Sequence, residues 1–218
     1  MLKVITMASI GSLFDLYSER KEEIRKRIGE FEEGMEYSEE RIFAELCFCL
    51  CTPQCKAVTC WKVVSTLAEK GLLYAGSEDE IARHLCVRFR NVRARRIVEA
   101  RRFFSHDGRL KMKDELKGFD DILVLREWLV GNIKGLGMKE ASHFLRNIGL
   151  GLGLAILDRH ILKNLKRLGV IEKIPRSLSK PSYEEIEKKM KSFSERIGIP
   201  MAEIDLLLWS FETGMVFR

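Results

Sequence analysis

One stretch of the chain carries most of the structural information: Ile133-Lys134-Gly135-Leu136-Gly137-Met138-Lys139-Glu140-Ala141. Helical segments flank a turn that contains Gly135 and Gly137. Glycine permits positive φ and has no Cβ to block a close approach. The second helix should begin directly after Gly137, so its first N–H groups lack partners and lie at the positive end of the helix dipole. That geometry suits a phosphate oxygen, although an ordinary glycine-capped turn between helices has the same pattern.

Two residues near this turn have side chains suited to catalysis. Lys139 lies in the first turn of the second helix, where the dipole disfavours a cation, and a neutral amine there can attack a sugar carbon to form a Schiff base. A solvated helix lysine is the alternative. Asp158 follows a glycine-rich segment, residues 149–157, and is the expected N-cap of the next helix. One carboxylate oxygen can cap the helix while the other stabilises positive charge or assists proton transfer.

Helical periodicity dominates the rest of the chain, and alternating runs rich in Val, Ile and Thr are absent, so we predict an all-α fold. The segment 175–181 is the expected linker. Capping residues, prolines and glycines mark the expected helices: 12–29, 38–50, one from about Pro53 to Leu67, 77–85, 91–104, 120–130, 138–147, one after Asp158, one from Ser182 and one from Pro200.

Composition limits the possible classes of protein. The chain has 218 residues, 46% hydrophobic and 32% charged, with a formal net charge of +6. A moderate positive charge suits a polyanionic partner but does not prove one. No run approaches the ~20 apolar residues that a membrane-spanning helix needs. Met1–Gly11 lacks the charged start and cleavage site of a signal peptide, so we expect a cytoplasmic protein.

The cysteines do not indicate a metal or redox site. Five of the six lie between Cys47 and Cys60, and no pair has the C-x-x-C spacing. We expect reduced thiols packed on a core helix.

The hairpin and the aspartate together resemble a known family. Gly135 to Ala141, followed by Asp158-Arg159-His160-Ile161, is similar to the helix-hairpin-helix and the aspartate-terminated loop of the base-excision DNA glycosylases. The family's usual hairpin proline is Lys134 here, and the loop before Asp158 has no proline. The resemblance implies that Lys139 is the nucleophile and Asp158 its carboxylate partner. A lysine at this position implies a bifunctional enzyme, a glycosylase with AP-lyase activity.

The resemblance also narrows the family. No cysteine follows Cys86, so the iron–sulfur cluster of endonuclease III and the adenine glycosylases would lack its ligands, and no cofactor is required. The chain most resembles the archaeal-type 8-oxoguanine glycosylases. The implied architecture has one helical subdomain at residues 38–147, ending in the hairpin. A second subdomain, residues 1–37 and 148–218, carries the aspartate and the C-terminal helix, with a DNA-binding cleft between the two.

The C-terminal helix is the expected base-recognition element. It is apolar nearly all round, so it should be buried, yet Asp205 interrupts the run with Trp209 four residues later on the same face. By resemblance, Trp209 and Phe89 sandwich the flipped base, while Asp205 and the terminal Arg218 contact its edge. The family's usual last residue is lysine. Core packing is the alternative for Trp209.

Further residues are implied to contact DNA. Gln54, within Thr52-Pro53-Gln54-Cys55-Lys56-Ala57, would fill the gap left by the flipped base, or else is a surface residue at a helix start. Gly135 and Gly137 would bind the DNA backbone. The family's hairpin also binds a monovalent cation, which by position would contact the main-chain oxygens of Gly131, Ile133 and Leu136. The arginine-rich stretch 88–96 either follows a phosphate backbone or is a solvated helix face.

Two alternative functions remain open. One is the same chemistry on other oxidised bases, and the other is a helix-hairpin-helix module that binds DNA without catalysis. A metal-dependent nuclease is disfavoured because no carboxylate or histidine cluster has ligand spacing. We expect a monomer that acts on double-stranded DNA containing an oxidised purine, in association with the nucleoid of a prokaryote and with no membrane.

Overall fold

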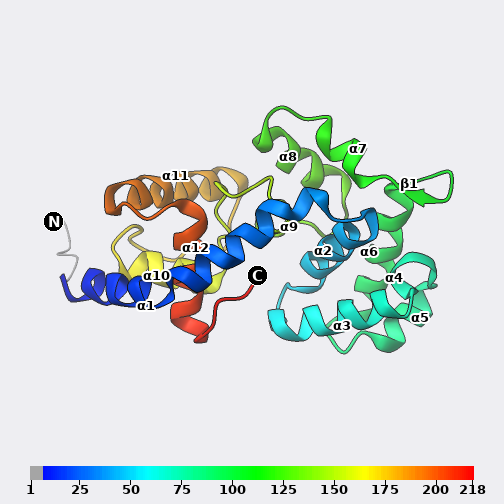
Figure 1. Ribbon diagram of the computed structural model, residues 1–218, viewed down its shortest axis with the longest axis horizontal. Coiled ribbons are helices and arrows are strands. Elements are labelled where there is room, and N and C mark those ends of the chain that lie inside the picture. Colours follow the sequence, from blue (N-terminus) through cyan, green and yellow to red (C-terminus); the bar gives the residue numbers. More distant parts are fainter. Residues whose placement is uncertain (1–6) are drawn as a thin grey trace. The chain divides into compact units, whose positions relative to one another are not determined.

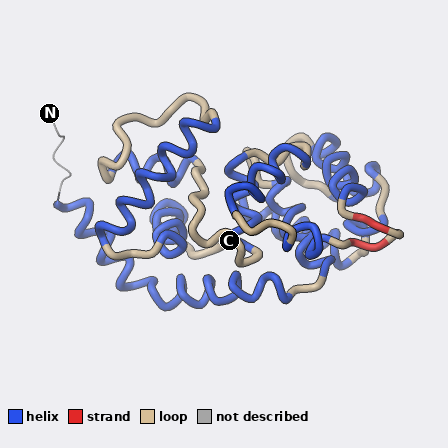
Figure 2. Tube along the Cα trace, turned by 90° about the horizontal axis from the view of Figure 1, so that it is seen from above, coloured by secondary structure: helices blue, strands red, loops and turns tan. Residues whose placement is uncertain are grey.

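The computed structural model describes residues 7–218 and the side chains of residues 10–218, so the start of the segment Met1–Gly11 lies outside it. Helices make up all the regular structure of the described residues apart from one two-stranded hairpin, which confirms the predicted all-α class (Figures 1 and 2). The α-helices, in chain order, are α1 (Met7–Glu32), α2 (Glu39–Cys51), α3 (Ala57–Glu69), α4 (Leu72–Ala75), α5 (Glu78–His84), α6 (Arg90–Phe103), α7 (Met112–Lys117), α8 (Ile122–Asn132), α9 (Met138–Asn147), α10 (Arg159–Arg167), α11 (Lys180–Ile197) and α12 (Met201–Thr213).

The chain divides into two compact units. The continuous unit is Glu33–Gly151, and the discontinuous unit joins the described residues up to Glu32 to Leu152–Arg218. The boundaries expected from the sequence, 38 and 147, lie inside the continuous unit. That unit includes the 3-10 helix Glu33–Glu36 because Gly34 packs directly on the chain after α9. A Cβ at Gly34 would lie 2.5 Å from the Cα of Ile148, so this close backbone contact requires glycine.

Polar contacts fix α1 to α12 within the discontinuous unit. The two helices lie side by side in Figure 1, where α1 is blue and α12 is red. The hydroxyl of Tyr17 and the Nε of Arg25 both donate to the buried carboxylate of Glu203, the latter over 3.3 Å. Arg20 donates to the carbonyl of Ser210 over 3.2 Å. The first helix therefore completes a core whose other helices lie at the far end of the sequence.

The centre of the continuous unit is α2. From Ile42 to Cys51 every residue is buried, which requires the nearly uniform apolar sequence of this helix. Ser38 caps it by accepting from the Arg41 amide, as predicted from the sequence. Glu39 in its first turn accepts from the Met112 amide over 2.5 Å and so joins the start of α7 to the start of α2.

Two expected helix starts were wrong. The helix expected from about Pro53 begins at Ala57. Gln54 has a left-handed φ of 58°, which is incompatible with a right-handed α-helix, and residues 52–56 form a turn. The linker expected to extend to Pro181 ends earlier. Ser179 caps α11, and Pro181 lies in its first turn, where proline needs no amide partner.

Four short elements were not predicted. They are the 3-10 helix Glu33–Glu36, the single-turn helix α4, the helix α7, and a hairpin of two strands, β1 (Ser105–His106) and β2 (Arg109–Leu110), drawn red in Figure 2. Elements of two to six residues have too few positions for a hydrophobic period to be recognised.

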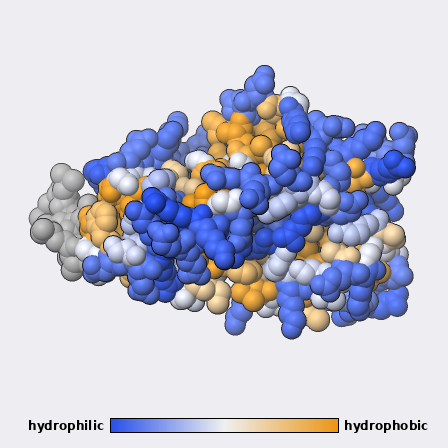
Figure 3. Space-filling view, in the orientation of Figure 1, coloured by the Kyte–Doolittle hydropathy of each residue, from blue (hydrophilic) through white to orange (hydrophobic). Residues whose placement is uncertain are grey.

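The surface is mostly polar. Figure 3 is largely blue in this view, with hydrophobic side chains gathered over α8, where Leu123 and Val124 are exposed. No described helix is long and apolar enough to cross a membrane. Within residues 7–218 there is also no group of three or more His, Cys, Asp or Glu side chains placed to hold a metal ion.

Candidate active site and DNA-binding elements

The predicted hairpin is present. Gly135 has a φ of 90°, and Gly137 is the N-cap of α9, which begins at Met138 as expected. The turn closes through a 3.1 Å hydrogen bond from the Leu136 amide to the Ile133 carbonyl. Because Gly137 has no side chain to cap the helix, the first amides of α9 remain available to an anion.

Side chains of α6 pack against this hairpin. A Cβ at Gly135 would lie 2.5 Å from Cδ and Nε of Arg96, so the arginine packs directly on this glycine, and the φ of 90° favours glycine at this position. Lys134, which replaces the family's proline, pairs with Glu99 over 3.2 Å. The ion pair ties the turn to α6, and no described carboxylate pairs with Arg96. Its guanidinium therefore adds positive charge beside the open amides of α9.

Lys139 is shielded but reachable, with 21% of its side chain exposed. Its Nζ lies 2.9 Å from Oε1 of Glu140 and donates to Oγ1 of Thr52 over 3.3 Å. The Thr52 hydroxyl in turn donates to the Cys49 carbonyl over 2.9 Å, which orients its lone pairs towards the lysine. The amine is thus held between the end of α2 and the first turn of α9.

Asp158 is the N-cap of α10, as predicted. One carboxylate oxygen, Oδ1, accepts from the amides of His160 and Ile161 at 2.7 and 2.9 Å. No described residue hydrogen-bonds to Oδ2. The cap therefore fixes the carboxylate through one oxygen and leaves the other available for chemistry.

Side chains of α11 and α12 hold the loop that leads to Asp158. Tyr183 donates to the Ala155 carbonyl over 2.6 Å and accepts from the Leu157 amide over 3.3 Å. Oδ1 of Asp205 accepts from the Ile156 amide over 3.4 Å. Asp205 is 3% exposed, so its burial is compensated by hydrogen bonding to this loop.

The C-terminal tail returns to the predicted base-recognition helix. Trp209 is partly exposed and stacks on Phe217, with ring centroids 6.3 Å apart and planes at 27°. Arg218 follows directly, so the terminal residue lies next to the aromatic pair. The indole ring of Trp209 is therefore not enclosed by the core alone, because the C-terminal tail covers part of it.

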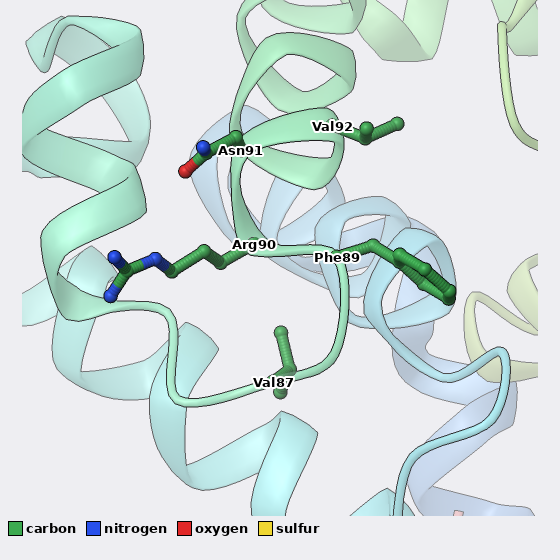
Figure 4. A pocket seen from close by; sticks show the side chains of 5 residues that line it. All are labelled: Val87, Phe89, Arg90, Asn91 and Val92. Carbon is green, nitrogen blue, oxygen red and sulfur yellow. The ribbon is translucent and has the colours of Figure 1, made fainter.

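Gln54 and Phe89 occupy turns with the same unusual backbone. Each has a φ of 58° and an exposed side chain, and Phe89 is 56% exposed. Phe89 is the N-cap of α6; its ring points to one side of the turn, and Arg90 and Asn91 point to the other (Figure 4). Non-glycine residues avoid this region of φ, so these turns are held by their surroundings.

The predicted site residues fall into both units. The continuous unit contains Lys139, Gln54, Phe89 and the two hairpin glycines; the discontinuous unit contains Asp158, Asp205, Trp209 and Arg218. Three residues that contact the predicted site residues were not singled out from the sequence: Thr52, Arg96 and Glu140. Thr52 and Glu140 lie within the motifs that contain Gln54 and Lys139. Their closeness in sequence to these residues could have identified them as part of the site.

A lysine in the first turn after a glycine hairpin, with a capping aspartate in the next helix, defines the class of helix-hairpin-helix DNA glycosylases. A family model described as 8-oxoguanine DNA glycosylase matches residues 24–199. The chain belongs to this family, which confirms the resemblance drawn from the sequence.

Individual relatives agree over nearly the whole chain. An 8-oxoguanine DNA glycosylase/AP lyase of Fusobacterium nucleatum is 42% identical over 205 residues, 93% of this chain and 94% of the relative. The crystal structure of Methanocaldococcus jannaschii 8-oxoguanine glycosylase/lyase in complex with 15mer DNA containing 8-oxoguanine matches with a TM-score of 0.88 and 37% identity, covering 97% of this chain and 100% of that one. The Thermotoga maritima 8-oxoguanine DNA glycosylase matches with a TM-score of 0.85 and 36% identity, covering 95% and 97%.

Proposed function

We propose that this protein is a bifunctional DNA glycosylase/AP lyase that excises 8-oxoguanine from duplex DNA in base excision repair. The position of Lys139 carries the proposal. Its amine is shielded, held by Thr52 and Glu140, and adjacent to the open amides of the hairpin. Family membership supplies the substrate class, since the relatives carry this activity in their names.

The chemistry proceeds in two stages. The Lys139 amine attacks C1′ of the damaged nucleotide, the glycosidic bond breaks, and the base leaves with the proton that the amine gives up. Opening of the sugar then yields an imine between Nζ and C1′. Loss of a C2′ proton breaks the bond from C3′ to its oxygen, which cuts the strand 3′ to the lesion, and water releases the lysine.

Asp158 stabilises the positive charge that develops at C1′ and assists the proton transfers. Its Oδ2 is suited to this task because both capping bonds go to Oδ1. For base recognition, we propose that Phe89 and Trp209 stack on the extruded base, and that Asp205 and Arg218 contact its edge. Gln54 fills the gap in the duplex.

The hairpin binds the DNA backbone through the main chain at Gly135 and Gly137. We propose that the main-chain oxygens of Gly131, Ile133 and Leu136 also hold a monovalent cation there. The residues fit such an ion, since the three carbonyls lie within six consecutive residues at the end of α8 and in the turn after it. Of these oxygens, only that of Ile133 accepts a described hydrogen bond, from the Leu136 amide. Replacing potassium with a bulky organic cation at constant ionic strength should weaken DNA binding, and unchanged affinity would remove this part of the proposal.

The setting follows from the substrate. We propose that the protein works as a monomer in the cytoplasm, on nucleoid DNA, and requires no other cofactor. Sedimentation of the free protein at micromolar concentration tests the oligomeric state.

The decisive assay compares damaged duplexes. We expect strand cleavage of a duplex with one 8-oxoguanine, none of an undamaged duplex, and loss of cleavage in Lys139→Gln. Preferential cleavage of a duplex with an oxidised pyrimidine would contradict the assignment of 8-oxoguanine as substrate but would leave the lysine mechanism in place. Binding without cleavage of any duplex would favour a DNA-binding module and leave Lys139 an ordinary lysine.

A further inference from the structure

A buried arginine lies behind the turns that carry Gln54 and Phe89. Arg93, on the first turn of α6, is 3% exposed. Its Nε donates to the Arg88 carbonyl over 2.6 Å, and Nη1 donates to the Leu50 carbonyl over 3.1 Å. The two terminal nitrogens also donate to the carbonyls of Cys51 and Pro53. All four acceptors are main-chain oxygens, and no carboxylate of the described residues pairs with this charge.

The location explains how a lone buried cation is tolerated. Because α2 ends at Cys51, its last carbonyls lack helical partners and form the negative end of the helix dipole. A guanidinium presents five N–H groups in a rigid plane, so Arg93 can satisfy carbonyls on two separate segments at once. Lysine, with three donors at one point, cannot span them.

Two of the carbonyls that Arg93 binds belong to the residues directly before the exposed Gln54 and Phe89. Pro53 precedes Gln54, and Arg88 precedes Phe89, so Arg93 holds the carbonyl that enters each strained turn. A further bond joins the turns directly, since the Arg88 amide donates to Sγ of Cys55 over 3.4 Å. The left-handed backbone at both positions persists only where its surroundings impose it.

We propose that Arg93 is a positioning residue for base extrusion, which sets the gap-filling Gln54 and the base-stacking Phe89 relative to each other. The inference rests on the proposed function and adds a residue to it. Arg93 itself contacts neither the base nor the phosphates. Its effect is confined to the steps that need both turns, which are extrusion of the base and support of the opened duplex.

Arg93→Lys tests this role, and Arg101→Lys is the matched control. Arg101 lies on the same helix and also donates to carbonyls, those of Leu73 and Gly76 at 3.1 and 2.8 Å, but it contacts neither turn. In Arg93→Lys, single-turnover excision of 8-oxoguanine should fall about 10- to 100-fold, while borohydride trapping on a single-stranded abasic oligonucleotide stays within about twofold, because only the first reaction needs base extrusion. Arg101→Lys should leave both rates near the wild type.

A double-mutant comparison separates positioning from a general loss of structure. In a Gln54→Ala, Phe89→Ala background, Arg93→Lys should have little further effect on excision, because the side chains that it orients are gone. An equal loss in both backgrounds would overturn the proposal, as would unchanged excision in Arg93→Lys alone. Melting curves verify that each variant is folded.

Hydrogen exchange gives a readout that does not depend on activity. Exchange in segments 50–56 and 87–90 should accelerate in Arg93→Lys and not in Arg101→Lys; no acceleration would overturn the proposal even if excision changed. In the wild type, the Nε–H of Arg93 should exchange slowly, and fast exchange would overturn the proposal without any variant. Loss of wild-type excision and trapping, by contrast, would refute the proposed function and leave the exchange result to decide on Arg93.

Discussion

At the scale of single residues, the two oxygens of Asp158 have different surroundings. Oδ1 accepts both capping bonds, and Oδ2 accepts none from a described residue. The structural and chemical contributions of this side chain can therefore be separated by a substitution that keeps the cap. Asparagine is as good an N-cap as aspartate but carries no charge.

Asp158→Asn should abolish most activity and leave the fold intact. We expect the free energy of unfolding to change by less than about 0.5 kcal/mol, because the side-chain oxygen still caps α10. Excision should slow by roughly 10²- to 10⁴-fold, because the neutral amide neither stabilises charge nor transfers protons. Urea unfolding and single-turnover kinetics measure the two effects. Normal excision with a large loss of stability would make Asp158 a purely structural cap.

At the scale of elements, α6 packs against the hairpin, and we propose that the two form one DNA-binding surface. Arg96 packs on Gly135, and the Lys134–Glu99 pair holds the turn to the helix. In the proposed complex, Arg96 would contribute a side-chain charge next to a phosphate held by main-chain amides.

Arg96→Gln should weaken DNA binding in a salt-dependent way. Loss of one phosphate contact lowers the slope of log affinity against log salt by about 0.9. Arg102→Gln is the control, since that arginine is exposed on the last turn of α6 and has no hydrogen bond or ion pair to the hairpin among the described residues. Fluorescence anisotropy with an undamaged duplex at several salt concentrations gives both slopes. Identical slopes for Arg96→Gln and the wild type would show that Arg96 only packs on the glycine.

The same elements show how far sequence reasoning reaches. The hairpin and the cap at Asp158 are encoded in a few consecutive residues, so their glycines and capping residues predict them directly. The turn at Gln54 was taken for a helix start, because what holds it is Arg93, about forty residues away in the chain. Arg93 was interpreted only as part of a basic stretch, because three of the carbonyls that it binds lie about forty residues earlier and give no signal in the sequence around Arg93.

At the scale of the whole molecule, the reactivity of the cysteine thiols depends on whether the continuous unit is folded. Burial raises the pKa of Cys47 and Cys49 well above the ordinary value and raises the pKa of Cys51 and Cys60 to about 12. These four thiols therefore stay protonated near neutral pH as long as the unit is folded, and only the thiolate reacts with alkylating agents.

Alkylation of the native protein at pH 8 should modify the exposed Cys86 first and the partly exposed Cys55 more slowly. The other four cysteines should react only in denaturant, or as the pH approaches the raised pKa values. Mass spectrometry of timed samples counts the modified sites. Rapid labelling of all six at pH 8 would mean that α2 is not packed as described.

The central claim is that Lys139 is the nucleophile of a glycosylase/lyase. The most direct measurement is borohydride trapping with a duplex carrying one 8-oxoguanine, followed by mass spectrometry of the peptide that retains the sugar remnant. We predict a covalent adduct on Lys139 in the wild type and none in Lys139→Gln. An adduct that persists in Lys139→Gln, or one that maps to another residue, would contradict the account.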